Sequence, residues 1–282
     1  MRLIDLIETV PKAIFLIDAS GVLYSNNGFI KESAKTFQYL QKQGPTFLAS
    51  NNSYHYPNDI AHNLFVEGTI KLNPDHIISS GHGLAKDPII SNIITDKIIY
   101  FIGPKAAEHY ALDAPIKGIT QQLEHAEAII LAGFNENQST TILDKIITIA
   151  KKNPSLPIIC CNKDRHIRAK QGLQPVVGYY AEKLESQLNS PLYWFGKPLK
   201  NFSNLVKTHL KTHKLNPHKS TLFFDDNLEN VISMQNHLGI SGCWIKETGI
   251  LYKQDEDTLL KKFGKPTYSL ATFNLTNTLT IY

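Results

Sequence analysis

The chain has 282 residues, 42% of them hydrophobic, which is enough to bury one large core or two moderate ones. Its formal net charge is +4, but the Lys and Arg residues are scattered and not gathered with aromatic residues into a stripe, which argues against nucleic acid as a partner. The three cysteines lack the spacing of a metal site, which favours a reducing cytoplasm. We find no cleavage signal and no apolar run that approaches the ~18 residues of a membrane span, so a membrane partner is not expected.

The first predicted strand covers residues 13–17 and ends at Asp18. Its apolar residues follow one another without a polar interruption, which is typical of a parallel strand buried on both faces by helices. Asp18 therefore lies at the carboxyl end of a buried strand, where open α/β sheets bind their ligands. Gly21 lets the chain turn sharply just afterwards. The simpler alternative is an Asp that only forms this turn.

A helix, a strand and a second helix are expected next. Apolar residues at helical spacing predict a helix over 32–43, which Gly44-Pro45 ends. Residues 46–49 form a second short strand, and the polar residues 50–53 can cap the helix that follows. This alternation predicts a right-handed parallel arrangement, with Asp18 and Ser50 at the same edge of the sheet.

The strand and helix pattern restarts near residue 73, which indicates a second, smaller α/β unit. Its clearest helix covers 140–151. Strand-like runs lie at 77–78, 97–102, 128–131 and 156–161.

Beyond Pro191 the elements again resemble the first part of the chain. Residues 192–195 read as a strand before Gly196-Lys197-Pro198, and a helix is expected over 201–214. The buried strand 221–224 ends in Asp225 and Asp226, a helix follows as far as Gly239, and residues 243–245 form the last strand. We therefore predict a doubly wound parallel α/β core made of residues 1–74 and 192–282, with an inserted α/β cap domain over 75–191.

Several polar side chains converge in this arrangement. Two strand ends supply Asp18 and the Asp225-Asp226 pair, a third supplies Ser50, and a loop brings Lys197. Carboxylates from different strands suit Mg²⁺, while a hydroxyl at a helix N-terminus and a lysine ammonium suit a phosphate. A site of this kind would let Asp18 attack a phosphorus atom whose negative charge is neutralised.

The motifs resemble those of the haloacid dehalogenase superfamily in their order along nearly the whole chain. The closest branch is the NagD-like group, which includes nitrophenylphosphatases and pyridoxal-phosphate phosphatases, and which carries its cap between the second and third motifs. The four motifs are Asp18-x-x-Gly21-Val22-Leu23, Leu48-Ala49-Ser50-Asn51-Asn52-Ser53, Gly196-Lys197-Pro198 and Phe224-Asp225. Landmarks of the middle section that are similar to the cap are 78–81, 102–104, 161–165 and Gly178.

The resemblance implies a role for each matching residue. Asp18 would be the nucleophile that becomes an aspartyl phosphate, Ser50 the hydroxyl that binds the phosphate, and Lys197 the charge neutraliser. Mg²⁺ would be held by Asp18, Asp225 and the main-chain carbonyl of Ser20. Candidate contacts to the substrate or its phosphate are Asn51 and Asn52 in the core, with Asn162, Asp164 and His166 in the cap.

Two motifs depart from the phosphatase pattern. The family's general acid/base aspartate, two residues after the nucleophile, is Ser20 here, and losing such a group typically costs roughly 10²- to 10⁴-fold in rate. In the fourth motif Phe224, Glu229 and Asn230 replace the usual glycine, threonine and second acid. Asn230 can still hydrogen-bond a metal-bound water. Asp226 is expected to point away, because neighbouring side chains on a strand alternate.

Two functions are therefore considered. The first is an Mg²⁺-dependent phosphatase that acts on a small phosphorylated metabolite in the cytoplasm, with weakened acid catalysis. The alternative is a catalytically inactive protein that binds a phosphorylated ligand or regulates. The substrate is not readable from the cap loop, and a cap surface could support a homodimer.

Two pairs of residues are assigned no catalytic or metal-binding role. His209 and His213 have the spacing of a metal pair but lie among lysines, which favours a solvated helix face. Cys160 and Cys161 are expected to pack in the core. His55 is retained as a candidate replacement for the missing acid/base.

Overall fold

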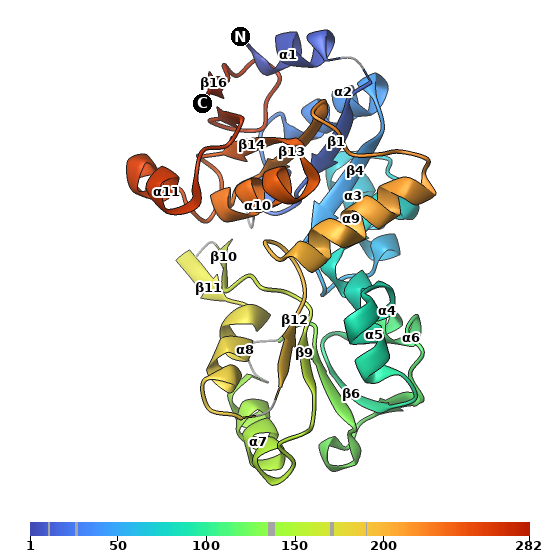
Figure 1. Ribbon diagram of the computed structural model, residues 1–282. Helices are drawn as coiled ribbons and strands as arrows, with labels where there is room; N and C mark the ends of the chain where they lie inside the picture. The colour runs from blue at the N-terminus through green and yellow to red at the C-terminus, as the bar shows by residue number, and fades with distance from the viewer. Residues whose placement is uncertain (11, 26–27, 135–138, 170–171, 190) are drawn as a thin grey trace.

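The computed structural model describes residues 1–10, 12–25, 28–134, 139–169, 172–189 and 191–282. Two separate sheets of mainly parallel strands lie one below the other (Figure 1). The upper, seven-stranded sheet has the order β16-β15-β14-β13-β1-β4-β5, and the lower, five-stranded sheet has the order β12-β9-β8-β6-β7. The predicted fold class, a doubly wound parallel core with a second α/β unit, is therefore confirmed.

The core sheet is parallel apart from its last strand, which runs antiparallel to its neighbour. Arg2 bridges to Thr278 beside this strand, and both chain ends lie at the top of the core (Figure 1). The strands are β1 (Ile14–Ile17), β4 (Thr46–Ser50), β5 (Ile77–Ser79), β13 (Thr221–Asp225), β14 (Ser241–Ile245), β15 (Tyr268–Leu270) and β16 (Thr280–Ile281).

Helices cover both faces of the core sheet, as the apolar strands require. Alternate residues of β1 face opposite ways: Phe15 packs in one apolar cluster with Phe37 of α2, and Leu16 in another with Phe202 of α9. The first face is covered by α1 (Leu3–Thr9), α2 (Ser33–Gln43) and α3 (Pro57–Gly68), and the second by α9 (Lys200–Thr212) and α10 (Leu228–Leu238). Helix α11 (Glu256–Phe263) packs beside α10.

The cap has its own sheet and its own apolar cluster around Ile129, Ile146 and Ile158. Its strands are β6 (Ile98–Ile102), β7 (Gly118–Thr120), β8 (Ala128–Leu131), β9 (Ile158–Cys160) and β12 (Leu192–Trp194). Its helices are α4 (Gly83–Lys86), α5 (Pro88–Ile94), α6 (His109–Leu112), α7 (Ser139–Lys152) and α8 (Val177–Glu185).

The remaining short elements complete the two units. Two hairpins are formed by β2 (Tyr24–Ser25) with β3 (Gly28–Phe29), and by β10 (His166–Ala169) with β11 (Gly172–Pro175). Short 3₁₀ helices lie at η1 (Pro74–His76), η2 (Ser80–His82), η3 (Lys105–Glu108) and η4 (Leu123–His125). Within the described ranges, every helix is too short or too polar to cross a membrane.

Strand pairing differs from the predicted domain limits at both ends of the insertion. Strand β5 was expected in the cap, but it pairs with β4 in the core sheet, Ser79 opposite Ser50. Strand β12 was expected in the core, but it pairs with β9 of the cap, Leu192 opposite Ile158. We therefore propose that the cap begins after Ser79 and ends at Trp194, in place of residues 75 and 191.

Candidate active site

The predicted nucleophile and its partners meet at the carboxyl edge of the core sheet. Ile17 is level with Leu48 of β4 and with Phe224 of β13, so Asp18, Ser50 and Asp225 all emerge at that edge. The Asp18 N–H continues the ladder by donating to the Phe224 carbonyl at 2.8 Å. All three side chains are buried. The register of three neighbouring strands thus brings the first, second and fourth motifs together.

Lys197 joins the two strand-end carboxylates. Its ammonium lies 2.7 Å from Asp18 Oδ1 and 2.6 Å from Asp225 Oδ2, and it donates to the Ala49 carbonyl at 3.0 Å. Only 1% of the residue is exposed. Burial by itself lowers the pKa of this amine, but the two carboxylates outweigh burial and the pKa is raised. Lys197 is therefore a fixed positive charge.

The main chain around Lys197 is held by the side chain of Asn51. Asn51 Oδ1 accepts from the Lys197 N–H at 2.7 Å, and Asn51 Nδ2 donates to the Lys197 carbonyl at 3.0 Å. Gly196 has a φ of +118°, and a Cβ there would lie 2.8 Å from Asn51 Oδ1, so the approach needs glycine. The second amide hydrogen of Asn51 goes to Asp164 of the cap at 3.0 Å. Asn51 was expected near the phosphate. Its side chain instead fixes the loop that carries Lys197 and links this loop to Asp164 of the cap.

Asp226 does not point away from the site, contrary to the expectation from strand alternation. Its carboxylate and those of Asp18 and Asp225 each offer an oxygen, and these oxygens all lie within 4.8 Å of one another. Strand β13 ends at Asp225, so the alternation rule no longer applies to the next residue. The Ile250 N–H donates to Asp226 Oδ2 at 2.9 Å and fixes the side chain.

Two glycines make room for this carboxylate. A Cβ at Gly21 would lie 2.5 Å from Asp226 Cγ, and one at Gly249 would lie 1.9 Å from Asp226 Oδ2. Gly21 also has a φ of +78°, which favours glycine. The residues that accommodate Asp226 are far apart in sequence, so sequence reasoning missed the contact. The available signal was the pair of adjacent carboxylates at a strand end.

The carboxylate cluster is more negative than Lys197 can balance. Burial raises the pKa of Asp225, with repulsion from Asp18 adding to it and attraction to Lys197 opposing it. Burial, and then repulsion from Asp225 and Asp18, raises the pKa of Asp226. Three buried carboxylates beside one ammonium favour either protons or a bound cation.

The donor set suits the magnesium ion that the resemblance implies. Mg²⁺ takes oxygen ligands and commonly uses one or two carboxylates with several waters. Asn230 hydrogen-bonds both oxygens of Asp225, at 3.3 and 3.4 Å, while its own Oδ1 is buried without a hydrogen-bond partner among the described residues. An unsatisfied buried oxygen next to a carboxylate cluster fits a metal-bound water.

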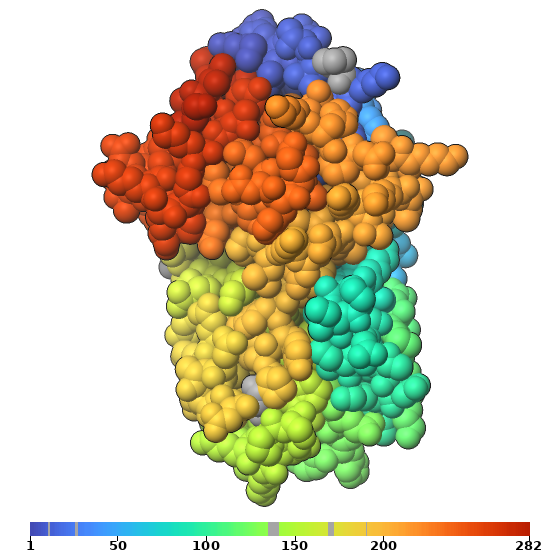
Figure 2. Space-filling view, in the orientation of Figure 1, coloured from blue at the N-terminus to red at the C-terminus, as the bar shows by residue number. Residues whose placement is uncertain are grey.

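The cap loop after β9 lies over this edge of the core. Asn162 Oδ1 accepts from the Asp164 N–H at 2.7 Å, and Asp164 Oδ1 accepts from Asn51. Burial raises the pKa of Asp164 to about 6, partly opposed by Lys197 and by the hydrogen bond from Asn51. Arg168 Nε of the cap hairpin donates to the Gly249 carbonyl at 2.8 Å. Figure 2 shows the cap seated directly against the core on this face.

Three other predicted residues follow Asp18 or Ser50 closely in the sequence and have different contacts. Ser20 is exposed, and its position two residues after Asp18 carries no carboxylate. Asn52 Oδ1 accepts from the N–H groups of Tyr54 and His55 and so shapes the second-motif loop. The side chain of His55 lines a cavity of about 190 Å³ with Asn52 and Glu67, and burial lowers its pKa. The cysteines Cys160 and Cys161 are buried, as expected for core residues.

Comparison with known proteins agrees with this geometry. Residues 15–117 match the family model of the haloacid dehalogenase-like hydrolases. No curated protein matches the chain. A possible sugar phosphatase of the haloacid dehalogenase superfamily from Cytophaga hutchinsonii is similar in structure, with a TM-score of 0.80 and 24% identity over 95% of this chain and 96% of that one.

Two further structures share the fold. The p-nitrophenyl phosphatase from Archaeoglobus fulgidus has a TM-score of 0.74 and 20% identity over 93% of this chain and 96% of that one. The 4-nitrophenylphosphatase from Thermotoga maritima has a TM-score of 0.73 and 18% identity over 98% of both chains. The chain therefore has the haloacid dehalogenase fold. More narrowly, its fold is that of the NagD and p-nitrophenyl phosphatase-like group, as its motifs predicted.

Proposed function

We propose that the protein is a metal-dependent phosphatase that acts on a small phosphorylated metabolite through Asp18. The observation that carries the proposal is the buried contact of Lys197 with both Asp18 and Asp225, at 2.7 and 2.6 Å, beside a third carboxylate. A lysine that holds the nucleophile in place and neutralises it lets the carboxylate approach a phosphate dianion. The similar structures named as phosphatases support this choice.

In the proposed reaction, Asp18 attacks phosphorus and the bond from phosphorus to the ester oxygen breaks. The phosphoryl group passes to Asp18 as an acyl phosphate, and the leaving oxygen takes a proton from water. Water then cleaves the acyl phosphate and regenerates Asp18. Bound Mg²⁺, held by Asp18, Asp225, Asp226 and the Ser20 carbonyl, would neutralise the charge on the phosphoryl oxygens.

Each of the other residues has a defined task in this proposal. Ser50 donates a hydrogen bond to the phosphate, and Asn51 keeps Lys197 in place. Asn162 and Asp164 lie in the cap loop that would contact the substrate, and Asn52 of the core is a further candidate contact. The cap would open to admit substrate and close to exclude water. Activity in the cytoplasm and a homodimer remain predictions, and the three free, buried cysteines agree with a reducing compartment.

The test is hydrolysis of p-nitrophenyl phosphate with Mg²⁺, because nitrophenolate leaves without needing a proton. We expect turnover by the natural protein and none by Asp18→Asn, with both proteins equally folded by circular dichroism. Asp144→Asn, which changes an exposed carboxyl on α7, is the matched control and keeps full activity. Equal activity of Asp18→Asn and the natural protein would refute the proposal.

Two replacements favour a second function, a protein that binds a phosphorylated ligand without turnover. Ser20 cannot act as a general acid near neutral pH, and Asn230 replaces an acidic residue of the fourth motif. This function predicts that inorganic phosphate binds in calorimetry and that Lys197→Met loses the binding. It also predicts no hydrolysis of p-nitrophenyl phosphate, even by Ser20→Asp.

A further inference from the structure

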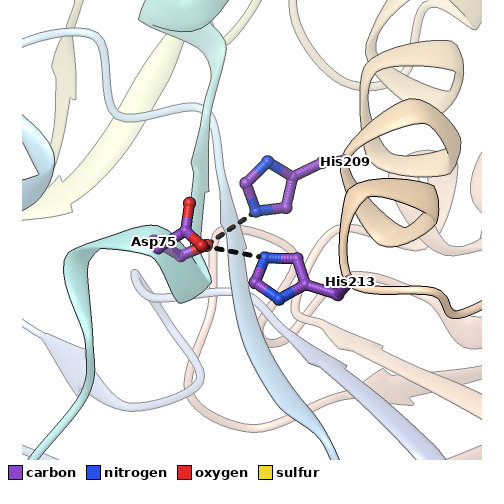
Figure 3. A group of neighbouring side chains, drawn as sticks. All are labelled: Asp75, His209 and His213. Carbon is purple, nitrogen blue, oxygen red and sulfur yellow. Dashed lines mark hydrogen bonds and ion pairs between the residues drawn. The ribbon is translucent and has the colours of Figure 1, made fainter.

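A second group of metal-ligating side chains lies away from the carboxylate cluster, between α9 and the turn before β5. His209 projects from the last turn of α9 and His213 from the residue that caps the C-terminus of this helix, and both point toward Asp75 of η1 (Figure 3). His213 Nε2 is 3.2 Å from Asp75 Oδ2, and His209 Nε2 is 2.7 Å from the Asp75 main-chain carbonyl. One ligand atom from each residue lies within 4.8 Å of the others.

The prediction of a solvated helix face is wrong for His209, which is only 6% exposed. It lies on the inner stripe of α9, four residues after Leu205, and faces the core. The ring of Phe47 packs edge-on against both imidazoles, with centroids 6.0 Å from His209 and 5.1 Å from His213. His76 stacks on the same phenyl ring at 4.6 Å. Packing therefore fixes both imidazole rings before any ligand arrives.

The contact of His213 with Asp75 does not satisfy the hydrogen-bonding capacity of the imidazole. Its Nε2 is buried and makes no hydrogen bond within the described part of the chain, although Asp75 Oδ2 lies only 3.2 Å away. A buried polar nitrogen without a hydrogen bond is uncommon and calls for an explanation such as an absent ion. Two ligands about 2.0 to 2.1 Å from a tetrahedral zinc ion lie roughly 3.3 Å apart, which is close to the 3.2 Å between His213 Nε2 and Asp75 Oδ2.

We propose that Asp75, His209 and His213 bind one divalent ion of the zinc class through two imidazole nitrogens and one carboxylate oxygen. Water would fill the fourth position, because the Asp75 side chain is 67% exposed and leaves the site open to solvent. The His209 ring would give up its hydrogen bond to the Asp75 carbonyl and carry its proton on Nδ1. Burial lowers the pKa of His209, which favours the neutral ring that coordinates metals.

The ion would have a structural effect on the fold. It would join the end of α9 to η1, which leads directly into β5 of the core sheet. Helix α9 begins three residues after Lys197, so this link would anchor the helix that follows the loop carrying Lys197. The site is separate from the carboxylate cluster. Loss of the ion should therefore lower the melting temperature without changing the arrangement of Asp18 and its partners.

The test is a titration with Zn²⁺ of untagged, chelator-treated protein in excess Mg²⁺, which occupies sites made of oxygen ligands. Calorimetry is expected to find one tight equivalent, and Co²⁺ in place of Zn²⁺ is expected to give the visible absorption bands of a tetrahedral site. His213→Ala and Asp75→Asn should each weaken binding at least tenfold. His62→Ala, on the exposed face of α3, is the control and should bind as the natural protein does.

Melting temperatures distinguish a variant that has lost the metal site from a variant that is misfolded. Zn²⁺ should raise the melting temperature of the natural protein and of His62→Ala, but not of His213→Ala or Asp75→Asn. Asp75→Asn keeps a side chain of the same shape at an exposed position, so it is expected to fold. The proposal is overturned if the natural protein binds no Zn²⁺ in excess Mg²⁺, or if both site variants bind it as tightly as the natural protein.

Discussion

Replacing Asp226 by Asn should stabilise the metal-free protein at pH 8. Two unit charges at 4.8 Å, the upper limit of the separations between the three carboxylate oxygens, interact by about 3.5 kcal/mol at an effective dielectric constant of about 20. In its ionised form Asp226 is repelled by Asp18 and by Asp225 and attracted by the single charge of Lys197, so roughly one such repulsion remains uncompensated. An amide removes that repulsion, and its oxygen can still accept from the Ile250 N–H. We therefore expect a gain of about 3 kcal/mol.

The effect should depend on pH. The pKa of Asp226 is raised in the folded protein, so the folded state holds a proton that the unfolded chain releases. Stability is then retained near the ordinary pKa of an Asp and is lost as the pH rises toward the raised value. The natural protein in a chelator should be less stable at pH 8 than at pH 5. Asp226→Asn should lose less over that range and should differ less from the natural protein at pH 5 than at pH 8.

Urea unfolding at pH 5 and pH 8, with EDTA or with Mg²⁺, measures these differences. Tryptophan fluorescence is a suitable signal, because Trp244 is one of the two tryptophans and its indole N–H donates to the Asp226 carbonyl at 3.0 Å. Mg²⁺ should stabilise the natural protein at pH 8 more than it stabilises Asp226→Asn, since the variant has lost a ligand. Asp144→Asn is the control. The reasoning is refuted if Asp226→Asn at pH 8 in EDTA is no more stable than the natural protein.

Three further outcomes are expected. Ser20→Asp should raise the rate of the first phosphoryl transfer from an alkyl phosphate by roughly 10²- to 10⁴-fold and that from p-nitrophenyl phosphate much less, and equal effects on this step for both esters would show that the introduced carboxyl group does not act as the acid. Asn51→Ala should lower kcat for p-nitrophenyl phosphate by ~10- to 100-fold through displacement of Lys197, and unchanged kcat would contradict the positioning role. Burial raises the pKa of Cys160 to about 12, so Ellman's reagent should modify the thiols only after unfolding, which labelling with and without urea checks.

The sequence predicted the strand-end residues of the site because their positions follow from local patterns. Apolar runs fixed the ends of β1 and β13, and parallel pairing then placed Asp18 and Asp225 at one edge. The orientation of the Asp226 side chain depends on the loop that contains Gly249, which is distant in the chain. Strand alternation was the wrong guide there, because the strand had already ended.

Short strands and polar helix faces were harder to predict. Strand β5 has three residues and β12 has three, too few for periodicity to show which sheet each one joins. The hydrogen bonds that the Asn51 amide donates to Lys197 and Asp164 join residues far apart in sequence. His209 lies in phase with the apolar stripe of α9, a signal that the neighbouring lysines obscured.

Trapping the aspartyl phosphate would show whether Asp18 is the nucleophile. Without a carboxylate two residues after Asp18, water should attack the aspartyl phosphate slowly, so the intermediate should accumulate. The protein would be mixed with p-nitrophenyl phosphate and Mg²⁺, quenched in acid and analysed by peptide mass spectrometry. We expect one added phosphoryl group on the peptide that contains Asp18 and none in Asp18→Asn. Turnover without any phosphorylated peptide, or with the group on another residue, would contradict it.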